Sequence, residues 1–428
     1  MLIENGSDGS MSRREFVKTT AATSVAFGLA SVVGAAHARG SDTIRVGLVG
    51  CGGRGTGAAA NALQADPGVE LFAMADLFAD RVIGSYDSLT GGDYRDRVNV
   101  TDSRKFVGWD AYQQLLALDE MDSVILATPP HFRPMQFAAS IAAGKHVFFE
   151  KPVGVDAIGI RSVLAAADEA DRNGLKVVAG TQRRHEAKYL QLMQRIHQGD
   201  IGDIVSGNIY WNGGELWSKP RRPEWSDMEW QLRNWLYFTW LSGDHIAEQH
   251  VHNIDVANWA IGDHPQSAMA LAGRQVRTDP AFGNIFDHFS VEFVYPGDVR
   301  VTSNCRQING CANRVDEFIV GTKGRVYFGR GRIEGDAPFQ FSGAHTNAYV
   351  QEHIDLFNAI RSGSEFNEAR NVATSTLTAI MGRMSAYTGQ RVTWEQALNS
   401  TLELTPGAYE FGSIPVRPVA VPGKTSLV

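Results

Sequence analysis

One stretch of the sequence concentrates titratable side chains. It reads WLSGDHIAEQHVHNIDVANWAIG and spans residues 240–262. We expect a helix from about Asp244, on which side chains spaced i, i+3, i+7 and i+10 share a face about 80° wide. These side chains are His245, Glu248, His252 and Asp255. An imidazole titrates near neutral pH, so this face could exchange a proton with a hydroxyl group.

A metal site is the alternative interpretation of the same face, because His and Glu on one helix can bind zinc. The spacing is not that of an HExxH motif, and no matching third ligand is obvious. We therefore expect no metal.

A glycine-rich turn follows the apolar run TIRVGLVG at residues 43–50 and precedes a helix-like segment. Its pattern is GxGxxG. Such glycines permit a tight turn and a close approach of the backbone to a pyrophosphate, and the helix N-terminus supplies free N–H groups. The residues that we expect to bind a dinucleotide here are Gly50, Gly52, Gly53, Arg54 and Gly55.

Asp76 ends a second strand-like run, VELFAMAD, at residues 69–76. A carboxylate at this offset from the glycine turn binds the ribose hydroxyls of adenosine and repels a 2′-phosphate. The sequence therefore favours NAD, and NADP remains a less favoured alternative because Arg81 is near in the sequence.

Two further strand-like runs cover residues 121–128 and 145–152, with a helical stretch at 135–144 between them. Alternating strands and helices predict a doubly wound parallel sheet that binds its ligand at the carboxyl ends of the strands. We expect the loops there to line the cofactor site through Thr128, Pro129, His131, Glu150 and Lys151.

Taken in order, GxGxxG, Asp76, Thr-Pro-Pro-His and Glu-Lys-Pro resemble the Gfo/Idh/MocA oxidoreductase family, over nearly all of residues 43–400. The resemblance implies that Lys151 lies beside the nicotinamide and the substrate hydroxyl, and that Glu150 orients it. It also implies that Glu248 and His252 occupy the positions of the family's catalytic pair, with His252 taking the hydroxyl proton. Glu248 stands where the family usually has Asp, so its exact role is open.

The expected fold class is α/β, an N-terminal Rossmann domain followed by an α+β domain with a large, mostly antiparallel open sheet. Alternating runs at 288–296, 299–307 and 321–328 predict strands of this sheet. Family members use its outer face to form dimers or tetramers, so the resemblance implies a homodimer or homotetramer. The expected divisions are a signal peptide at 1–38, the Rossmann domain at 42–165, the second domain at 166–404 and an extended arm at 405–428.

Six tryptophans fall within residues 210–240. Aromatic rings stack on the apolar faces of sugars, which favours a carbohydrate or glycoside substrate, although core or dimer packing explains any single tryptophan as well. The expected substrate-binding residues are Arg184, Trp235, His245 and Asp255, with Arg183, Arg233 and Asn234 as further lining residues.

The N-terminal segment looks like an export signal. SRREFVK at 12–18 precedes a weakly apolar stretch at 21–36, and Ala36-His37-Ala38 matches a cleavage site. The pattern predicts recognition by the twin-arginine export machinery, which carries folded proteins, and a periplasmic or otherwise exported location. A cofactor could then be loaded before export and carried out bound.

Composition limits the remaining classes of partner. The net charge is −7 and 20% of residues are charged, which argues against nucleic acid. Beyond the N-terminal segment we expect no membrane span, since no long uninterrupted apolar run occurs. Cys51, Cys305 and Cys311 are too few for a disulfide scaffold, and we expect separate thiols.

These observations predict hydride transfer between a tightly bound nicotinamide cofactor and a secondary alcohol of a sugar, polyol or glycoside. Released NADH could not be reoxidised by the usual pool outside the cytoplasm. A second substrate, a respiratory partner or a redox-neutral glycosidase cycle could reset it. The family's NAD-dependent glycosidases carry Tyr-Pro-Thr-His-Gly before the catalytic histidine, which this chain lacks. A non-catalytic sugar or nucleotide sensor is the alternative from another class.

Overall fold

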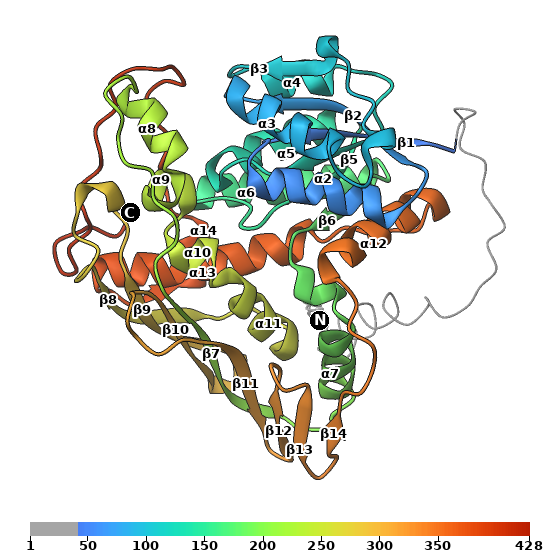
Figure 1. The fold of residues 1–428 in the computed structure, drawn as a ribbon. Coiled ribbons are helices and arrows are strands. Elements are labelled where there is room, and N and C mark those ends of the chain that lie inside the picture. Colours follow the sequence, from blue (N-terminus) through green and yellow to red (C-terminus); the bar gives the residue numbers. More distant parts are fainter. Residues whose placement is uncertain (1–41) are drawn as a thin grey trace, which may run out of the picture. The chain divides into compact units, whose positions relative to one another are not determined.

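The computed structural model describes residues 42–428 of the chain (Figure 1). The expected twin-arginine motif and its cleavage site fall within residues 1–41 and lie outside the described residues.

A parallel six-stranded sheet forms the first part of the described chain, in the order β3-β2-β1-β4-β5-β6. Its strands are β1 (Ile44–Val49), β2 (Val69–Asp76), β3 (Lys105–Val107), β4 (Ser123–Leu126), β5 (His146–Phe149) and β6 (Val177–Ala179). Most residues of the central strands are apolar and buried because helices cover both faces of the sheet. The predicted Rossmann domain is confirmed, with the short edge strand β3 as an addition that the sequence pattern did not indicate.

Helices join these strands and bury their apolar sides on the sheet. They are α2 (Gly53–Ala65), α3 (Ala79–Thr90), α4 (Ala111–Leu116), α5 (Arg133–Ala142) and α6 (Ala157–Arg172). The expected domain boundary at residue 165 falls inside α6, and β6 beyond it pairs with β5. The first sheet therefore extends past that boundary, because the last crossover helix must return the chain to the sheet edge.

A nine-stranded sheet forms the second part, in the order β14-β13-β12-β11-β7-β10-β9-β8-β15. The strands are β7 (Ile204–Gly213), β8 (Ser267–Gly273), β9 (His288–Tyr295), β10 (Val299–Gln307), β11 (Arg314–Gly321), β12 (Gly324–Tyr327), β13 (Arg332–Gly335), β14 (Phe339–Gln340) and β15 (Val392–Thr393). Neighbours are antiparallel except for β7 and β10, which run parallel. The predicted large, mostly antiparallel sheet is confirmed.

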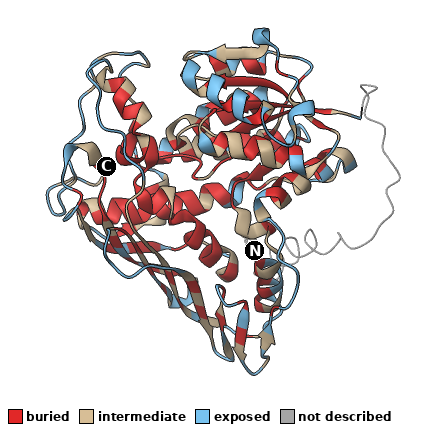
Figure 2. Cartoon of the chain, viewed as in Figure 1, coloured by how far each residue is buried: buried red, intermediate tan, exposed pale blue. Residues whose placement is uncertain are grey.

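The inner face of this sheet carries the second core. Phe289, Val291, Phe293 and Tyr295 alternate along β9 and are buried, while the residues between them are more exposed. They share an apolar cluster with the long helix α13 (Ala369–Thr388), which crosses the sheet in Figure 1 and is almost entirely buried in Figure 2. Helix α12 (Ala348–Ser362) packs on α2, as expected for a segment returning to the nucleotide domain.

The helix expected from Asp244 is instead two helices. Helix α10 (His245–Glu248) ends, and α11 (Val251–Ile261) begins after a break at Gln249 and His250. At this break the buried ring of His250 bonds the Ser303 hydroxyl at 2.7 Å. The single-face argument for 244–255 therefore does not hold across the break.

The other helices of the second part are α7 (Ala187–His197), α8 (Asp227–Arg233), α9 (Thr239–Ser242) and α14 (Trp394–Leu398). Residues 405–428 contain no helix or strand. Cys51, Cys305 and Cys311 are separate thiols, the first two buried and the third exposed.

Candidate functional site

Two glycines of the turn are required by close backbone contacts, and two others border open space. Gly50 has φ +96°, and a Cβ on Gly55 would lie 1.8 Å from the Gly50 carbonyl oxygen, so these two glycines are needed for the turn. A Cβ on Gly52 or Gly53 would meet nothing within 4 Å. No side chain caps the N-terminus of α2, and its first turn holds no acid. Free N–H groups beside open space fit the pyrophosphate of a dinucleotide.

Asp76 links the end of β2 to the glycine turn. Its Oδ2 accepts the Cys51 N–H at 2.7 Å, and its Oδ1 accepts the Phe78 N–H at 2.9 Å. Burial raises the pKa of the Asp76 carboxyl, and these two donors partly offset that effect. A carboxylate has about four acceptor positions, so capacity remains for ribose hydroxyls.

Arg54 is held by two buried carboxylates rather than left free for a phosphate. It forms ion pairs with Glu150 and, at 3.0 Å, with Glu352 of α12. Burial, and next the charge of Glu150, raise the pKa of Glu352 well above its usual range. Glu150 fits there because residue 180 is glycine, where a Cβ would lie 2.7 Å from Glu150 Oε2.

Lys151 and Glu248, predicted from separate parts of the chain, meet in the structure. Lys151 Nζ donates to the Glu248 backbone carbonyl at 2.5 Å and to its Oε1 at 3.2 Å. Lys151 follows β5 and precedes a cis proline, and Glu248 ends α10. Both side chains keep a small exposed fraction, 13% and 15%. The pair is therefore largely desolvated and still accessible.

His252 lies on α11 with its ring stacked on Trp211 of β7, the centroids 5.6 Å apart. Its Nδ1 is buried and has no hydrogen-bond partner. Burial lowers the pKa of His252 well below its usual value, and the positive charges of Lys151 and Arg183 lower it further. The imidazole is therefore neutral at neutral pH, the form that accepts a proton.

A hydrogen-bonded group on β11 lies beside this histidine. Buried Glu317 pairs with Arg183, whose guanidinium lies 5.8 Å from the Trp211 ring. The Tyr189 hydroxyl donates to Glu317 at 3.0 Å, and Asn253 donates at 2.5 Å. Sequence reasoning missed Trp211, Glu317 and Asn253 individually, because only the tertiary structure brings β7 and β11 beneath α11.

Three of the predicted substrate residues are bonded within the core. Arg184 donates from Nε and Nη2 to the two carboxylate oxygens of Asp255, at 2.8 and 2.9 Å, and Asp255 also accepts from Ser375. His245 Nδ1 lies 3.0 Å from Asp244 Oδ1, and its ring packs on Phe289. The structure thus places these side chains in contact with each other or with core residues.

Trp235, the fourth predicted substrate residue, packs edge-on against Trp217 with ring centroids 6.2 Å apart. It lies between two apolar clusters. Of the two further lining candidates beside it, Arg233 pairs with Asp80 and Glu229, and Asn234 is fully buried.

Arg133 clamps the two loops that carry the expected cofactor residues. Its guanidinium donates to the carbonyls of Thr128 and Pro152, each at 2.5 Å. Burial lowers the pKa of Arg133 to about 10. The Thr128 hydroxyl donates to Gln136 at 2.6 Å. Sequence reasoning missed Arg133, although an arginine directly after Thr-Pro-Pro-His-Phe was the available signal.

His131 follows Pro129 and Pro130 in a single turn of 3₁₀ helix. Its Nε2 lies 2.8 Å from the Tyr409 hydroxyl, and its ring packs edge-on against Trp240. Burial lowers the pKa of His131 to about 4. The ring is therefore neutral at this loop.

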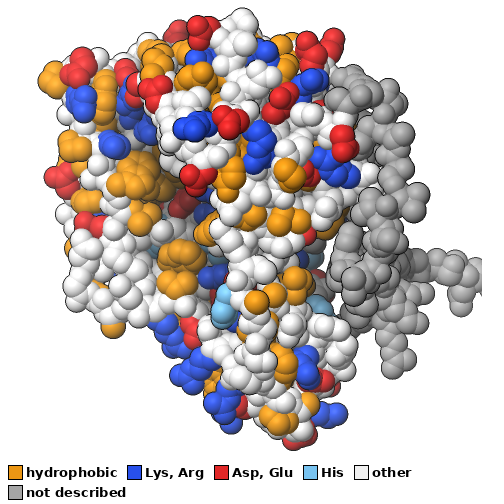
Figure 3. Space-filling view, turned by 45° about the vertical axis from the view of Figure 1, so that its right-hand side comes forward, with side chains coloured by type: hydrophobic (Ala, Val, Ile, Leu, Met, Phe, Trp, Pro, Cys, Tyr) orange, Lys and Arg blue, Asp and Glu red, His pale blue; other side chains and the backbone are white. Residues whose placement is uncertain are grey.

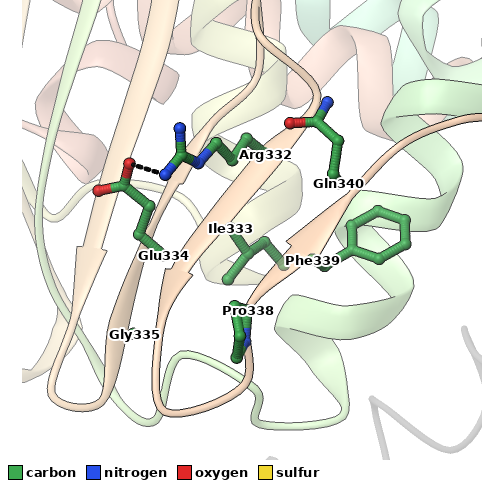
Figure 4. A pocket seen from close by; sticks show the side chains of 7 residues that line it. All are labelled: Arg332, Ile333, Glu334, Gly335, Pro338, Phe339 and Gln340. Atoms are coloured by element: carbon green, nitrogen blue, oxygen red, sulfur yellow. Dashed lines mark ion pairs between the residues drawn. The ribbon is translucent and has the colours of Figure 1, made fainter.

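A separate pocket opens at the far edge of the nine-stranded sheet (Figure 4). Its lining residues are Arg332, Ile333, Glu334, Gly335, Pro338, Phe339 and Gln340. None of the predicted site residues belongs to it. Two of these lining residues, Arg332 and Glu334, form an ion pair 2.8 Å long.

The described residues carry charges of both signs on their surface and contain neither a metal-binding cluster nor a helix that could cross a membrane. Acidic and basic side chains are interspersed on the face shown in Figure 3. Within residues 42–428, no group of three or more His, Cys, Asp or Glu residues is arranged to hold a metal. In the same residues, no helix combines the length and apolarity that a membrane crossing requires.

Two family models match the chain. One, described as "Oxidoreductase family, NAD-binding Rossmann fold" of GFO/IDH/MocA, matches residues 44–178. The other, the GFO/IDH/MocA C-terminal domain, matches residues 189–327. Together they cover well over half of the sequence.

Several curated proteins are similar in sequence at low identity, and the extent of the match differs among them. An inositol 2-dehydrogenase of Rhizobium meliloti is 26% identical over 354 residues, covering 78% of this chain and 94% of that protein. A 2,7-anhydro-N-acetylneuraminate hydratase of Escherichia coli is 24% identical over 53% of this chain and 57% of its own length. A family 109 glycosyl hydrolase protein of Streptomyces coelicolor is 26% identical over 39% of this chain and 33% of its own.

Solved structures share the fold. Scyllo-inositol dehydrogenase from Lactobacillus casei, with bound NAD(H) and scyllo-inositol, has a TM-score of 0.64 at 19% identity over 82% of this chain and 99% of that one. An aldose–aldose oxidoreductase from Caulobacter crescentus has a TM-score of 0.63 at 16% identity, over 82% and 99% of the two chains.

Proposed function

The chain belongs to the GFO/IDH/MocA oxidoreductase family, and from that premise we propose that it transfers hydride between a tightly bound NAD and a secondary alcohol of a sugar, polyol or glycoside. One observation carries the proposal: Lys151 and Glu248 form a nearly buried ion pair close to His252. Burial, and next the positive charge of Lys151, lower the pKa of His252 and keep its imidazole neutral. The names of the inositol and aldose enzymes support a polyol or sugar as substrate.

In the oxidation direction the substrate carbinol loses two electrons and becomes a ketone. NAD, held by the glycine turn and Asp76, would supply the acceptor for the hydride and its C–H electron pair. His252 accepts the hydroxyl proton on its neutral imidazole. Lys151 donates a hydrogen bond to the substrate oxygen and holds it in line, while the carbonyl and carboxylate of Glu248 fix the ammonium group.

Export with a retained cofactor is a separate part of the proposal. It rests on the twin-arginine pattern at 12–18 and on the lack of an NAD pool outside the cytoplasm. The cofactor would be reset in place by a second substrate or by a respiratory partner. The mature protein should then be found outside the cytoplasm with nucleotide bound.

The test uses protein purified from the periplasm. We expect denaturation to release close to one NAD(H) per chain, even after the native protein has been dialysed. Lys151→Met should keep this nucleotide and lose about 10²-fold or more of the rate of sugar or polyol oxidation. An empty or freely exchanging site would contradict the retained cofactor, and a Lys151→Met enzyme with full activity would contradict the assigned chemistry.

A redox-neutral reaction is the second candidate, because two of the relatives are named a hydratase and a glycosyl hydrolase protein. Oxidation at C3 of a glycoside would acidify the C2–H bond. A base would take that proton as the aglycone leaves from C1, water would add to the resulting double bond, and the C3 ketone would finally be reduced back to the alcohol, so that the cycle has no net redox change. Incubation of the loaded protein with glycosides and no added cofactor distinguishes the two. Hydrolysis at full turnover favours the glycosidase, and oxidised product that requires an acceptor favours the dehydrogenase.

A further inference from the structure

The C-terminal segment 405–428, which we call the C-terminal strap, is fastened to helix α8. The Gly412 carbonyl accepts the Met228 N–H at 3.1 Å, and the Ile414 carbonyl accepts Gln231 Nε2 at 3.2 Å. The Ser413 hydroxyl donates to Asp227 at 2.9 Å. These bonds fix the middle of the strap along one side of a single helix.

Two aromatic residues of the C-terminal strap reach the Rossmann domain. The Tyr409 hydroxyl lies 2.8 Å from His131 Nε2, and its ring centroid lies 5.9 Å from that of Trp109. Phe411 lies 5.5 Å from Trp109 and 5.9 Å from Phe78. The strap therefore bridges α8 and the nucleotide domain.

The contacted residues share one position in the Rossmann sheet. Phe78 follows β2 two residues after Asp76, Trp109 follows β3, and His131 follows β4. A doubly wound sheet binds its dinucleotide at the carboxyl ends of the strands. The C-terminal strap thus passes over the carboxyl ends of β2 and β3, where Asp76 would hold the adenosine ribose.

An ion pair holds helix α8 at the same edge of the Rossmann sheet. Arg233 donates two hydrogen bonds to Asp80 in the first turn of α3, each 3.0 Å long. Its guanidinium also lies 3.9 Å from the centroid of the Phe78 ring. The strap and α8 are therefore fastened to the nucleotide domain at the ends of β2, β3 and β4.

Phe411 remains 49% exposed although it belongs to this aromatic group. A half-exposed phenyl ring leaves apolar surface in water, and a purine packed beside it would cover that surface. The Phe411 ring thus keeps part of its apolar surface uncovered beside Phe78 and Trp109.

We propose that the C-terminal strap is part of the nucleotide site, with Phe411 and Tyr409 completing, together with Phe78 and Trp109, the outer wall of its adenosine half. This wall slows release of the nucleotide. The inference rests on the proposed function, since it presumes an NAD that stays bound through turnover. It assigns to this chain's own C-terminus the retention that an exported enzyme needs.

The experiment measures the rate constant of nucleotide release from the loaded full-length protein, after rapid dilution into an NAD-consuming trap. Phe411→Ala should speed release about tenfold or more, because it removes one wall of stacked aromatic contact. Tyr409→Phe keeps the ring and loses the bond to His131, so it should give a smaller increase. Val416→Ala, at an exposed position of the same strap, is the matched control and should release at the wild-type rate.

Thermal unfolding of each variant separates local from global effects. If Phe411→Ala fails to fold, Phe411→Leu keeps the apolar volume and removes only the ring face, and it should still speed release. Wild-type release rates in Phe411→Ala or Phe411→Leu would overturn the proposal while leaving the retained cofactor intact. A wild-type protein that already exchanges its nucleotide freely would contradict both the strap's role and the retention in the proposed function.

Discussion

His252 shows how burial prepares a side chain for its reaction. The ring lies under Trp211, has a buried Nδ1 with no partner, and faces the positive charges of Lys151 and Arg183. Each of these features disfavours the imidazolium form. The sequence shows a histidine at a suitable spacing, whereas its protonation state follows from neighbours that are distant in the chain.

We predict an unusual acid limit for the activity. The lowered pKa of His252 keeps the imidazole neutral at pH values where an ordinary histidine would be protonated, so kcat/KM for oxidation should hold below about pH 6.5. It should fall only as the pH drops through the depressed pKa. His252→Asn, which has no base, should lose about 10²- to 10⁴-fold in rate and lack this limb. An acid limb of the wild type at or above about pH 6.5 would argue against His252 as the base.

The charged residues predicted for the site show that the type of a residue does not determine its partner. Arg184 and Asp255 were both expected to bind substrate, and they bind each other. Arg54 was expected to bind the dinucleotide, and it pairs with Glu150 and Glu352. A buried charge needs a partner, and the partner is chosen by packing rather than by spacing in the chain.

At the scale of elements, the glycines of the turn between β1 and α2 are present for two different reasons. Gly50 and Gly55 are required by the fold, because a Cβ at either position would collide with backbone atoms. Gly52 borders open space, and its backbone, at φ −71° and ψ 179°, suits any residue. Its lack of a side chain therefore serves a ligand rather than the fold.

This distinction predicts the effect of one methyl group. Gly52→Ala should leave the free energy of unfolding within about 0.5 kcal/mol of wild type, yet weaken NAD binding about tenfold or more, because the Cβ occupies space needed by the pyrophosphate. Gly57→Ala in the same helix, where an added Cβ also meets nothing, is the control. It should stabilise the protein by about 0.5–1 kcal/mol and leave NAD affinity unchanged. Calorimetric titration and denaturant unfolding give both quantities, and equal affinities for the two variants would contradict a pyrophosphate at Gly52.

The break between α10 and α11 is the clearest difference between pattern and structure at this scale. The run from 244 to 261 is compatible with one continuous helix, and no proline or glycine interrupts it before Gly262. The break comes with a tertiary bond, from His250 to Ser303 of β10. Helical periodicity describes a local preference, which such contacts override.

At the scale of the whole molecule, His185 links the nucleotide domain to the segments that return to it. Its ring bonds Asp355 of α12 at 2.6 Å and Glu368, just before α13, at 3.3 Å. Burial alone would lower the pKa of His185, but the charges of Glu368 and Asp355 outweigh it and raise the pKa to about 10. The charged imidazolium therefore fastens three segments together.

The raised pKa predicts a stability that declines with alkaline pH. An unfolded histidine titrates near 6.5, so the contribution of His185 is full below about pH 6.5 and is lost as the pH rises towards about 10. Urea unfolding at pH 6, 8 and 10 should show wild type more stable than His185→Gln by a few kcal/mol at pH 6, with the gap shrinking at pH 10. The exposed His345→Gln is the control and should track wild type. A gap that does not depend on pH would show that the imidazolium pairs contribute nothing.

The local sequence by itself determined strands β1, β2, β4 and β5 of the Rossmann sheet, the glycine turn with Asp76, the Lys151 loop and the class of the second sheet. These features depend on local periodicity, on backbone freedom at glycine and on loops at strand ends, all of which are written in short segments. Only the tertiary structure decided that Lys151 meets Glu248, that Trp211 covers His252, that Arg133 clamps two loops and that Tyr409 and Phe411 reach the ends of β2, β3 and β4. Such contacts join residues far apart in the chain, and their selection depends on how buried charges and aromatic rings find partners once the domains pack.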